Sequence, residues 1–333
     1  MWDYASFNRQ GLEKIRRPEH FWLGTGIHFA LEQYALGHNP VDAFENWSNE
    51  AIALDKAEYA KHVGVNPSPN EFTGYINQKA LGLAMIEHYV EHWGSPIPQG
   101  FEYVEPELTL VAPIPNTPHE LVLTPDGLLA KRQYDEAGNV TGELFYVLDH
   151  KTYKQKPKEE VMRRSMQFIA YIWGTRAALR KRCVGIIYDG LLKKVAEEPR
   201  LLTTGKLGSS TTTTAALLER AIRRHNLPRE LYADRISQLI EDGNPFFIRF
   251  PIIRSDIEIQ SFEKHLANIV CEMAGDPIIY PNIQWQGCWD CTFTDICTAQ
   301  ESDEDYEYIV EHTYRQREPL EGYIKEEKQR EWD

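Results

Sequence analysis

The sequence predicts an α/β protein in which a mixed central sheet is flanked by helices. Short β-rich runs bounded by turn residues follow one another between residues 102 and 151. A long helical pattern and another apolar strand come next, the order expected when a helix crosses over between two strands of one sheet. With 333 residues, of which 42% are hydrophobic, the chain can build a large core, which excludes disordered and small disulfide-stapled classes.

The first hundred residues predict helices. Apolar residues recur at helical spacing over residues 23–36, and further helical candidates cover residues 42–62 and 75–93. A stretch rich in proline and glycine, residues 95–100, then stops helix formation. We therefore expect residues 1–100 to form a helical N-terminal region.

Residues 101–194 are expected to form the α/β core. The predicted strands are short runs of β-branched, aromatic and aliphatic residues between turn signals. The expected elements are strands over residues 102–112, 120–132 and 144–151, a helix over residues 158–180, and a strand over residues 184–193.

Three further segments follow this core. Residues 195–245 are expected to form a helical insertion. Residues 246–300 add a strand, a helix and a cysteine cluster that close the domain. Residues 301–333 form an acidic C-terminal tail.

Charge and hydropathy set limits on location and partners. No apolar run approaches the roughly 18 residues of a membrane helix, and the first residues lack the pattern of a signal peptide, so we expect a cytoplasmic protein without membrane association. The formal net charge of −14, taken over the whole chain, argues against a polyanionic partner. Half of that charge, −7, lies from residue 298 onward.

Asp149 and Lys151 end a strand whose preceding residues are all apolar. Side chains alternate along a strand, so this acid and base project from one face at the end of a buried element. A solvated strand end is one interpretation. Asp126, in the strand before, favours another, because antiparallel neighbours can bring it beside Asp149, and converging carboxylates repel unless a cation such as Mg²⁺ or Mn²⁺ neutralises them. The alternative for Asp126 is a residue of a Pro-Asp-Gly turn.

Helical residues complete the candidate site. His28 follows Gly24 by four residues and is a candidate ligand of the same metal through a ring nitrogen. Gly24 and Gly26 would let another backbone approach closely. Gln167 and Tyr171 share one face of the next helix and are candidates to orient a phosphate or a base. Ordinary packed or surface positions are the alternative for each of these side chains.

Three of the five cysteines crowd into ten residues. Cys288, Cys291 and Cys297 are too close together to be satisfied readily as disulfides, and they suit a soft metal or an iron–sulfur cluster. Cys271 is a candidate fourth ligand, with a buried core cysteine as its alternative. Cys183, just before a buried strand, is expected in the core. The site is then a cluster with an unusual fourth ligand, a zinc site completed by another residue, or a degenerate site.

Together these residues resemble the PD-(D/E)XK nuclease superfamily, specifically its RecB-like branch, which includes exonuclease V, CRISPR-associated exonucleases and phage exonucleases. The resemblance implies a restriction-endonuclease-like core. In branch members with a 4Fe-4S cluster, a similar cysteine trio is joined by a fourth cysteine N-terminal to the nuclease core, whereas this chain has no cysteine before Cys183. The matching motifs stand in family order: Gly24-x-x-x-His28, Pro125-Asp126, Asp149-x-Lys151-Thr152 and Gln167-x-x-x-Tyr171.

The resemblance also implies roles for these positions. His28, Asp126 and Asp149 would bind Mg²⁺ or Mn²⁺, together with the backbone carbonyl of His150. Lys151 would position or activate the attacking water and stabilise the phosphorane-like transition state. The glutamine and tyrosine of the later helix would hold the substrate and the geometry of the site. The cysteine trio would hold a structural 4Fe-4S cluster, with zinc as the alternative.

DNA is the implied partner, and the local charge agrees with it. Residues 151–182 hold ten basic and two acidic residues, and phosphates respond to the potential within about a Debye length. A solvated helix face is the alternative for the outer members of this set. The basic side chains expected to contact DNA are Lys154, Lys156, Arg163 and Arg164, and the aromatic ones that could stack on unpaired bases are Tyr153, Trp173 and Tyr188.

The implied activity is metal-assisted phosphodiester hydrolysis. We expect an exonuclease that acts on single-stranded or frayed DNA in replication or recombination, from a phage or a bacterium. A structure-specific endonuclease on the same site and a non-catalytic DNA-binding recombination subunit are the alternatives, and the presence of Asp126, Asp149 and Lys151 argues against the second. A recombinase, a helicase or a single-strand-binding protein is the expected protein partner.

Overall fold

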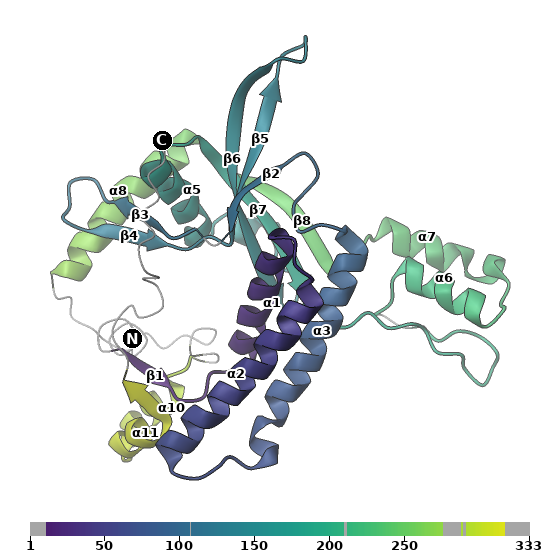
Figure 1. The fold of residues 1–333 in the computed structure, drawn as a ribbon, viewed down its shortest axis with the longest axis horizontal. Coiled ribbons are helices and arrows are strands. Elements are labelled where there is room, and N and C mark those ends of the chain that lie inside the picture. The colour runs from purple at the N-terminus through teal and green to yellow at the C-terminus, as the bar shows by residue number, and fades with distance from the viewer. Residues whose placement is uncertain (1–10, 107, 210–211, 276–287, 289–290, 317–333) are drawn as a thin grey trace.

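The computed structural model describes residues 11–106, 108–209, 212–275, 288 and 291–316. Within them, five strands form a central sheet in the order β2-β5-β6-β7-β8 (Figure 1). All neighbours in this sheet are antiparallel except β6 and β7, which are parallel, so the predicted mixed sheet is confirmed. The strands are β2 (Glu102–Pro106), β5 (Gly127–Tyr134), β6 (Val140–Tyr153), β7 (Cys183–Leu192) and β8 (Phe247–Ile253).

A helical crossover joins the parallel strands β6 and β7, as the sequence predicts. The single helix expected over residues 158–180 is in fact two helices, α4 (Glu159–Met162) and α5 (Met166–Leu179). Between them the chain turns tightly, because the N–H groups of Arg164 and Ser165 donate to carbonyls three residues back. The break leaves Arg163 and Arg164 outside both helices.

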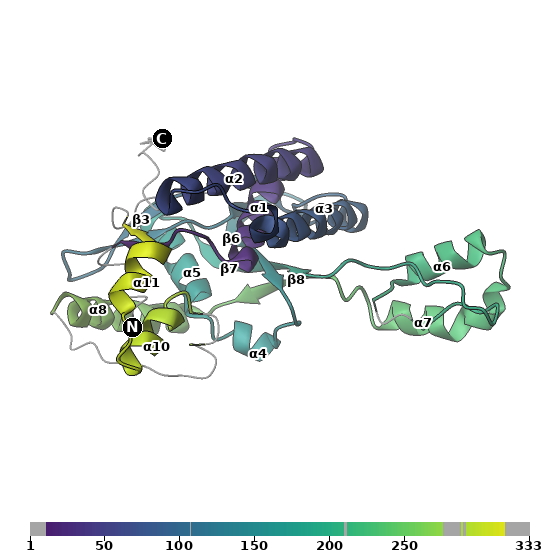
Figure 2. The same cartoon turned by 90° about the horizontal axis from the view of Figure 1, so that it is seen from below.

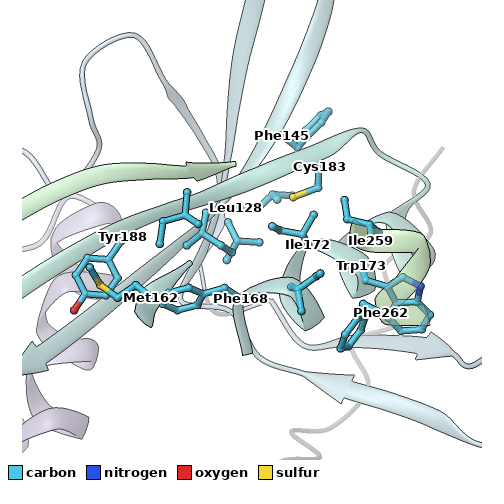
Figure 3. Close-up of a cluster of buried hydrophobic side chains, with 14 of the residues drawn as sticks. Leu128, Phe145, Met162, Phe168, Ile172, Trp173, Cys183, Tyr188, Ile259 and Phe262 are labelled. Carbon is cyan, nitrogen blue, oxygen red and sulfur yellow. The ribbon is translucent and has the colours of Figure 1, made fainter. Parts of the chain in front are cut away.

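One face of the sheet packs against α5 and α8 (Asp256–Ala274). β7 is buried over nearly its whole length and β6 is buried from Val147 to His150, as expected for strands covered by helices on both faces. Figure 3 shows the resulting core cluster, in which strand residues such as Phe145 and Cys183 meet Ile172 of α5 and Phe262 of α8. This core fixes the strands that carry the candidate site.

Three N-terminal helices lie on the other side of the sheet (Figure 2): α1 (Glu19–Ala35) and α3 (Thr73–Trp93) contact its strands, and α2 (Pro40–Val63) packs on these two helices. A short 3₁₀ turn, Pro69–Phe72, precedes α3. Gly26 permits a close approach, since a Cβ there would lie 2.3 Å from the Trp47 ring; the expected close neighbour is thus a side chain and not a backbone. None of the helices in the described part of the chain is long and apolar enough to cross a membrane.

Two of the predicted strands are each broken in two. The segment 102–112 gives β2 and then β3 (Leu110–Pro113), while the segment 120–132 gives β4 (Glu120–Leu123) and then β5. β3 and β4 pair with each other in a separate antiparallel ribbon that packs against α5. Proline has no N–H for a ladder, so Pro106 and Pro125 lie at the two breaks.

Residues between β7 and β8 project from the molecule. They contain α6 (Ala215–Arg224), the 3₁₀ turn Arg229–Tyr232 and α7 (Ala233–Glu241), which extend to one side on a long connection (Figures 1 and 2). This projection has a small apolar cluster of its own that includes Leu218, Tyr232 and Ile236.

The two ends of the described chain meet. β1 (Leu12–Lys14) pairs antiparallel with β9 (Tyr314–Gln316), which follows α10 (Thr294–Glu301) and α11 (Tyr306–Thr313). Leu12, Phe293, Ile296 and Tyr314 form the apolar cluster beneath this pair. Arg315 adds ion pairs to Glu13 and to Glu58 of α2, so the C-terminal helices are tied to the N-terminal region.

Candidate active site

The candidate site forms where β6 extends past the start of β5. Gly127, the first residue of β5, pairs with Leu148, so β6 beyond Leu148 has no β5 partner. Asp126 takes that place, because its Oδ2 accepts the N–H of His150 at 2.7 Å. The break in the predicted strand at Pro125 therefore puts a carboxylate beside the end of β6.

Asp149 and Lys151 share the face of β6 that packs against α5. Lys151 Nζ donates to Asp149 Oδ1 at 2.9 Å. The Asp149 side chain is 1% exposed, whereas that of Lys151 is 32% exposed. The second oxygen, Asp149 Oδ2, is buried and has no hydrogen-bond partner among the described residues. A buried carboxylate oxygen without a partner is costly, and this one is the strongest sign of a ligand position in the site.

His28, on α1, also lies at the end of β6, beside Asp126. Its Nδ1 lies 2.8 Å from Asp126 Oδ1, and its ring centroid is 6.2 Å from that of His150. Gly24, one helical turn earlier, faces Thr152, because a Cβ there would lie 3.8 Å from the threonine Oγ1. The Gly24-x-x-x-His28 spacing thus lays α1 along the end of β6.

Burial and charge move three pKa values in this site. Burial opposes the charged form of His28, but the Asp126 carboxylate outweighs it and raises the pKa of His28 above 6.5. Burial also opposes the Asp126 carboxylate, yet the nearby His28 outweighs it and lowers the pKa of Asp126 to about 2. Burial raises the pKa of Asp149 to about 6 in spite of Lys151. Asp149 is therefore the carboxyl group whose charge still lacks full compensation.

Gln167 and Tyr171 lie close to the chain segment that carries Asp126. Gln167 Nε2 donates to the Tyr171 hydroxyl at 3.2 Å. That hydroxyl in turn donates to the carbonyl of Thr124 at 3.4 Å, two residues before Asp126. The predicted helical pair thus contacts the connection between β4 and β5, and Gln167 is exposed on the α5 surface.

The candidate metal ligands are two carboxylates, an imidazole and a main-chain carbonyl, which are group types that bind hard divalent cations. They are not assembled around one point: within the described ranges, no group of three or more His, Cys, Asp or Glu side chains is arranged to hold a metal ion. His28 and Asp126 are bonded to each other, and Lys151 occupies Asp149 Oδ1. A cation would provide the missing partner for Asp149 Oδ2.

The four basic side chains expected to contact DNA are exposed beyond the end of β6. Arg163 is engaged in an ion pair with Glu159, with its Nη2 2.6 Å from the carboxylate. Farther along, Arg176 has a structural role, because it pairs with Asp256 and donates to the carbonyl of Cys183. The other three expected contacts are Lys154, Lys156 and Arg164.

Tyr153, Trp173 and Tyr188, the aromatic candidates for stacking on bases, are buried and cannot take that role. Their exposed fractions are 8%, 3% and 3%, and all three belong to the core cluster between the sheet and α5. An aromatic residue in a strand or helix with one buried face is a core residue unless its side chain turns outward, and the sequence does not show which way it turns.

The cysteines are distributed as follows. Cys183 is fully buried in the core, as predicted. Cys271 is exposed on α8, so its interpretation as a buried core residue is wrong. Cys288, Cys291 and Cys297 are partly buried near the start of α10, where the Thr294 hydroxyl donates to the carbonyls of Cys288 and Cys291. Burial and then the neighbouring Cys291 raise the pKa of Cys297.

Sequence reasoning missed a buried polar network on the opposite face of β6. The His150 side chain, considered above only for its carbonyl, contacts Asp189 of β7, and Asp189 contacts Arg249 of β8 and Tyr89 of α3. The signal was present: Asp189 and Arg249 are charged residues inside otherwise apolar strands.

The fold and this site agree with a comparison to known families. Residues 4–298 match the sequence model of the PD-(D/E)XK nuclease superfamily, and the chain belongs to that superfamily. It is accordingly a metal-dependent nuclease, and DNA is the substrate that the family implies. No curated protein matches the chain.

Proposed function

We propose that this protein is a RecB-like exonuclease that digests single-stranded or frayed DNA during replication or recombination in a phage-infected or bacterial cytoplasm. The observation that carries the proposal is the convergence of His28, Asp126, Asp149 and Lys151 at the end of the central strand β6, where Asp149 Oδ2 has no hydrogen-bond partner among the described residues. The order of the four motifs along the chain supports the RecB-like assignment.

Each residue of the site has its own role in metal binding or in catalysis. His28, Asp126, Asp149 and the carbonyl of His150 would hold Mg²⁺ or Mn²⁺, which supplies a water of lowered pKa and offsets charge on the phosphate. Lys151, partly exposed beside the buried Asp149, orients the attacking water and donates hydrogen bonds to the phosphate oxygens as their charge develops.

Other groups hold the substrate. The Tyr171 hydroxyl and Gln167 fix the connection that carries Asp126 and present polar atoms toward the DNA. The exposed Lys154, Lys156 and Arg164 lie just beyond β6 and would bind backbone phosphates. A helicase, recombinase or single-strand-binding protein would supply the free end.

A structure-specific endonuclease on the same site is the second candidate. Incubation of end-labelled linear and of circular single-stranded DNA with the purified protein, in Mg²⁺, Mn²⁺ or chelator, distinguishes the two. We expect metal-dependent release of mononucleotides or short products from the linear DNA and intact circles. Cleaved circles would rule out a purely exonucleolytic enzyme in favour of the endonuclease, and no cleavage under any condition would favour the non-catalytic DNA-binding subunit.

Two variants assign the activity to this site. Lys151→Ala should reduce cleavage by roughly 100- to 1,000-fold, the range for loss of one group that stabilises transition-state charge, while DNA affinity stays close to wild type. Lys61→Ala changes an exposed lysine of α2 and serves as the matched control, with wild-type cleavage expected. Wild-type turnover in Lys151→Ala would place the chemistry elsewhere.

On the spacing of Cys288, Cys291 and Cys297 alone, a structural 4Fe-4S cluster is our proposal for the C-terminal region, with zinc as the alternative. The described residues do not assemble its ligands, and Cys271 stays a proposed fourth ligand on the sequence argument only. Iron and acid-labile sulfide in the anaerobically purified protein would support the cluster. Stoichiometric zinc would overturn it in favour of a zinc site, and absence of both would identify a degenerate site.

A further inference from the structure

The buried network behind the candidate site follows the register of three strands. In the parallel pair, His150 of β6 is directly opposite Asp189 of β7, and in the antiparallel pair Asp189 is opposite Arg249 of β8. Because side chains alternate along β6, His150 points away from Asp149 and Lys151, toward the N-terminal helices. Tyr89 of α3 reaches the same row from above the sheet.

Both carboxylate oxygens of Asp189 are used. Oδ1 accepts from Arg249 Nε at 2.9 Å, while Oδ2 lies 2.9 Å from His150 Nδ1 and accepts the Tyr89 hydroxyl at 2.5 Å. Arg249 Nη2 also donates to the Tyr89 hydroxyl oxygen at 2.6 Å, and its guanidinium lies 4.3 Å from the Trp93 ring centroid. Each member therefore holds at least one other in place.

Stability alone does not account for this arrangement. Asp189 and Tyr89 are 0% exposed and His150 is 2% exposed, so the charges lie in the interior. A buried ion pair is often no more stabilising than apolar residues that fill the same volume, because desolvation offsets the attraction. What such a network provides is a fixed geometry, and the residue it fixes is the central one of the Asp149-His150-Lys151 segment.

That segment requires support from β7 and β8. β5 begins at Gly127, opposite Leu148, so the last residues of β6 have a strand neighbour on the β7 side and none on the β5 side. On the open side, the His150 N–H orients Asp126. A small displacement of the His150 backbone would move that N–H together with both flanking side chains, and active sites lose activity when they are displaced by about 1 Å.

We propose that Asp189, Arg249 and Tyr89 are positioning residues of the nuclease site, which hold the His150 ring from behind the sheet and thereby fix Asp149, Lys151 and the N–H that orients Asp126. This inference rests on the proposed function. It predicts that weakening the network lowers metal affinity and turnover, although none of the three side chains touches the substrate face.

Tyr89→Phe tests the network with a small change, and Tyr75→Phe is its matched control. Both tyrosines lie on α3, both are 0% exposed and both donate a hydroxyl hydrogen bond, but Tyr75 bonds the carbonyl of Arg17, outside the network. Asp189→Asn is a stronger second variant, because it leaves Arg249 without a charged partner in the buried row. All three are compared with wild type by thermal unfolding, by Mn²⁺ binding without DNA followed by electron paramagnetic resonance, and by kcat and KM for DNA.

We expect Tyr89→Phe and Tyr75→Phe to lose similar stability. Tyr89→Phe, but not Tyr75→Phe, should weaken Mn²⁺ binding by roughly 10-fold, the lower end for groups that orient metal ligands. Its kcat should fall while KM stays within about twofold, a split that a purely structural role would not produce.

Wild-type Mn²⁺ affinity and kcat in folded Tyr89→Phe would overturn the inference, as would equal losses in Tyr75→Phe. If Asp189→Asn does not fold, Tyr89→Phe decides alone. A wild-type protein that binds Mn²⁺ but cleaves no DNA would overturn the proposed function, and the binding measurements would still decide the network. If instead only the positioning role is wrong, wild type and Tyr89→Phe will cleave DNA equally well.

Discussion

His28 of α1 and Asp126 of the β4–β5 connection are 98 residues apart in the chain, and their side chains are 2.8 Å apart in the fold. The pair is tightly coupled: the carboxylate raises the pKa of His28, and the imidazole lowers that of Asp126 to about 2. In the structure these two proposed metal ligands contact each other. A cation bound by both would have to separate the pair and would require the neutral imidazole.

Metal binding should therefore release a proton from His28. Nuclear magnetic resonance titration of the histidine ring protons should show a pKa above 6.5 without metal and a lower one in saturating Mg²⁺. His92, whose pKa burial and Arg249 lower, is an internal control that Mg²⁺ should leave unchanged. A His28 pKa that is insensitive to Mg²⁺ would remove this residue from the ligand set.

The buried Asp149 should destabilise the metal-free fold at neutral pH. Burial raises the pKa of its carboxyl from 3.8 to about 6, so the folded state disfavours the ionised form above pH 6, and this cost fades as pH falls from about 6 toward 4. In chelator at pH 8, Asp149→Asn should raise the free energy of unfolding by on the order of 2 kcal/mol. Chemical denaturation at several pH values measures the difference.

Asp256 is a control for Asp149, because the pKa of its carboxyl group is shifted in the opposite direction. It is exposed, and its hydrogen bond with Arg176 lowers the pKa of its carboxyl, so Asp256→Asn should not stabilise the protein at any pH. If Asp149→Asn were no more stable than wild type at pH 8, the carboxylate would already be compensated and the metal position would lie elsewhere.

The lysines beyond β6 should control the salt dependence of DNA binding. Each phosphate contact contributes about 0.7–0.9 to the slope of log affinity against log salt, so the double change Lys154→Ala and Lys156→Ala should reduce the slope by about 1.5. Arg163→Ala should have a smaller effect, because Arg163 is paired with Glu159. Fluorescence anisotropy from 50 to 300 mM salt, roughly the range in which such contacts weaken, measures the slopes, and parallel lines would exclude this segment from the interface.

Thiol reactivity should follow burial. Burial raises the pKa of Cys183 to about 12 and its side chain is 0% exposed, so it should react with a thiol reagent only after unfolding. Cys271 is exposed on α8 and should react first in protein from which any bound iron or zinc has been removed, whereas ligation to the proposed cluster would protect it. Mass spectrometry of the native protein after short labelling gives the order, and Cys271→Ser should remove the fast phase. Early labelling of Cys183 would mean that the core between β7 and α5 opens readily.

Sequence periodicity predicted the sheet but not its interruptions. The runs at 102–112 and 120–132 are β-rich at both ends, but each contains a proline, a residue that strands disfavour, and Pro125-Asp126-Gly127 is a turn signal. The break at Pro125 depends on where β5 finds its partner in β6, which is a tertiary relationship. That break is what brings Asp126 to the site, so the turn signal inside the predicted strand marks the boundary that the function needs.

The motif residues were predictable because their chemistry is unusual for their positions. A charged pair at the end of an apolar strand, such as Asp149 and Lys151, stands out in a single sequence. The residues that contact the His150 side chain were not predicted. They face one another across neighbouring strands, and which residues do so depends on the strand register, which local sequence spacing does not show. Charged residues inside apolar strands, such as Asp189 and Arg249, are the sequence signal that remained unused.

The pairing of β1 with β9 has a consequence for the order in which the protein is built. Arg315 bonds Glu13 across a separation of 302 residues, so this ladder cannot close until synthesis of nearly the whole described chain is complete. The central sheet ends at Ile253 and its strands are then already available on the ribosome. Closing so long a loop costs entropy for only three paired residues on each strand. The pairing of β1 with β9 is therefore the last part of the fold to form and the first to open. The sheet that carries the nuclease site is in place before it.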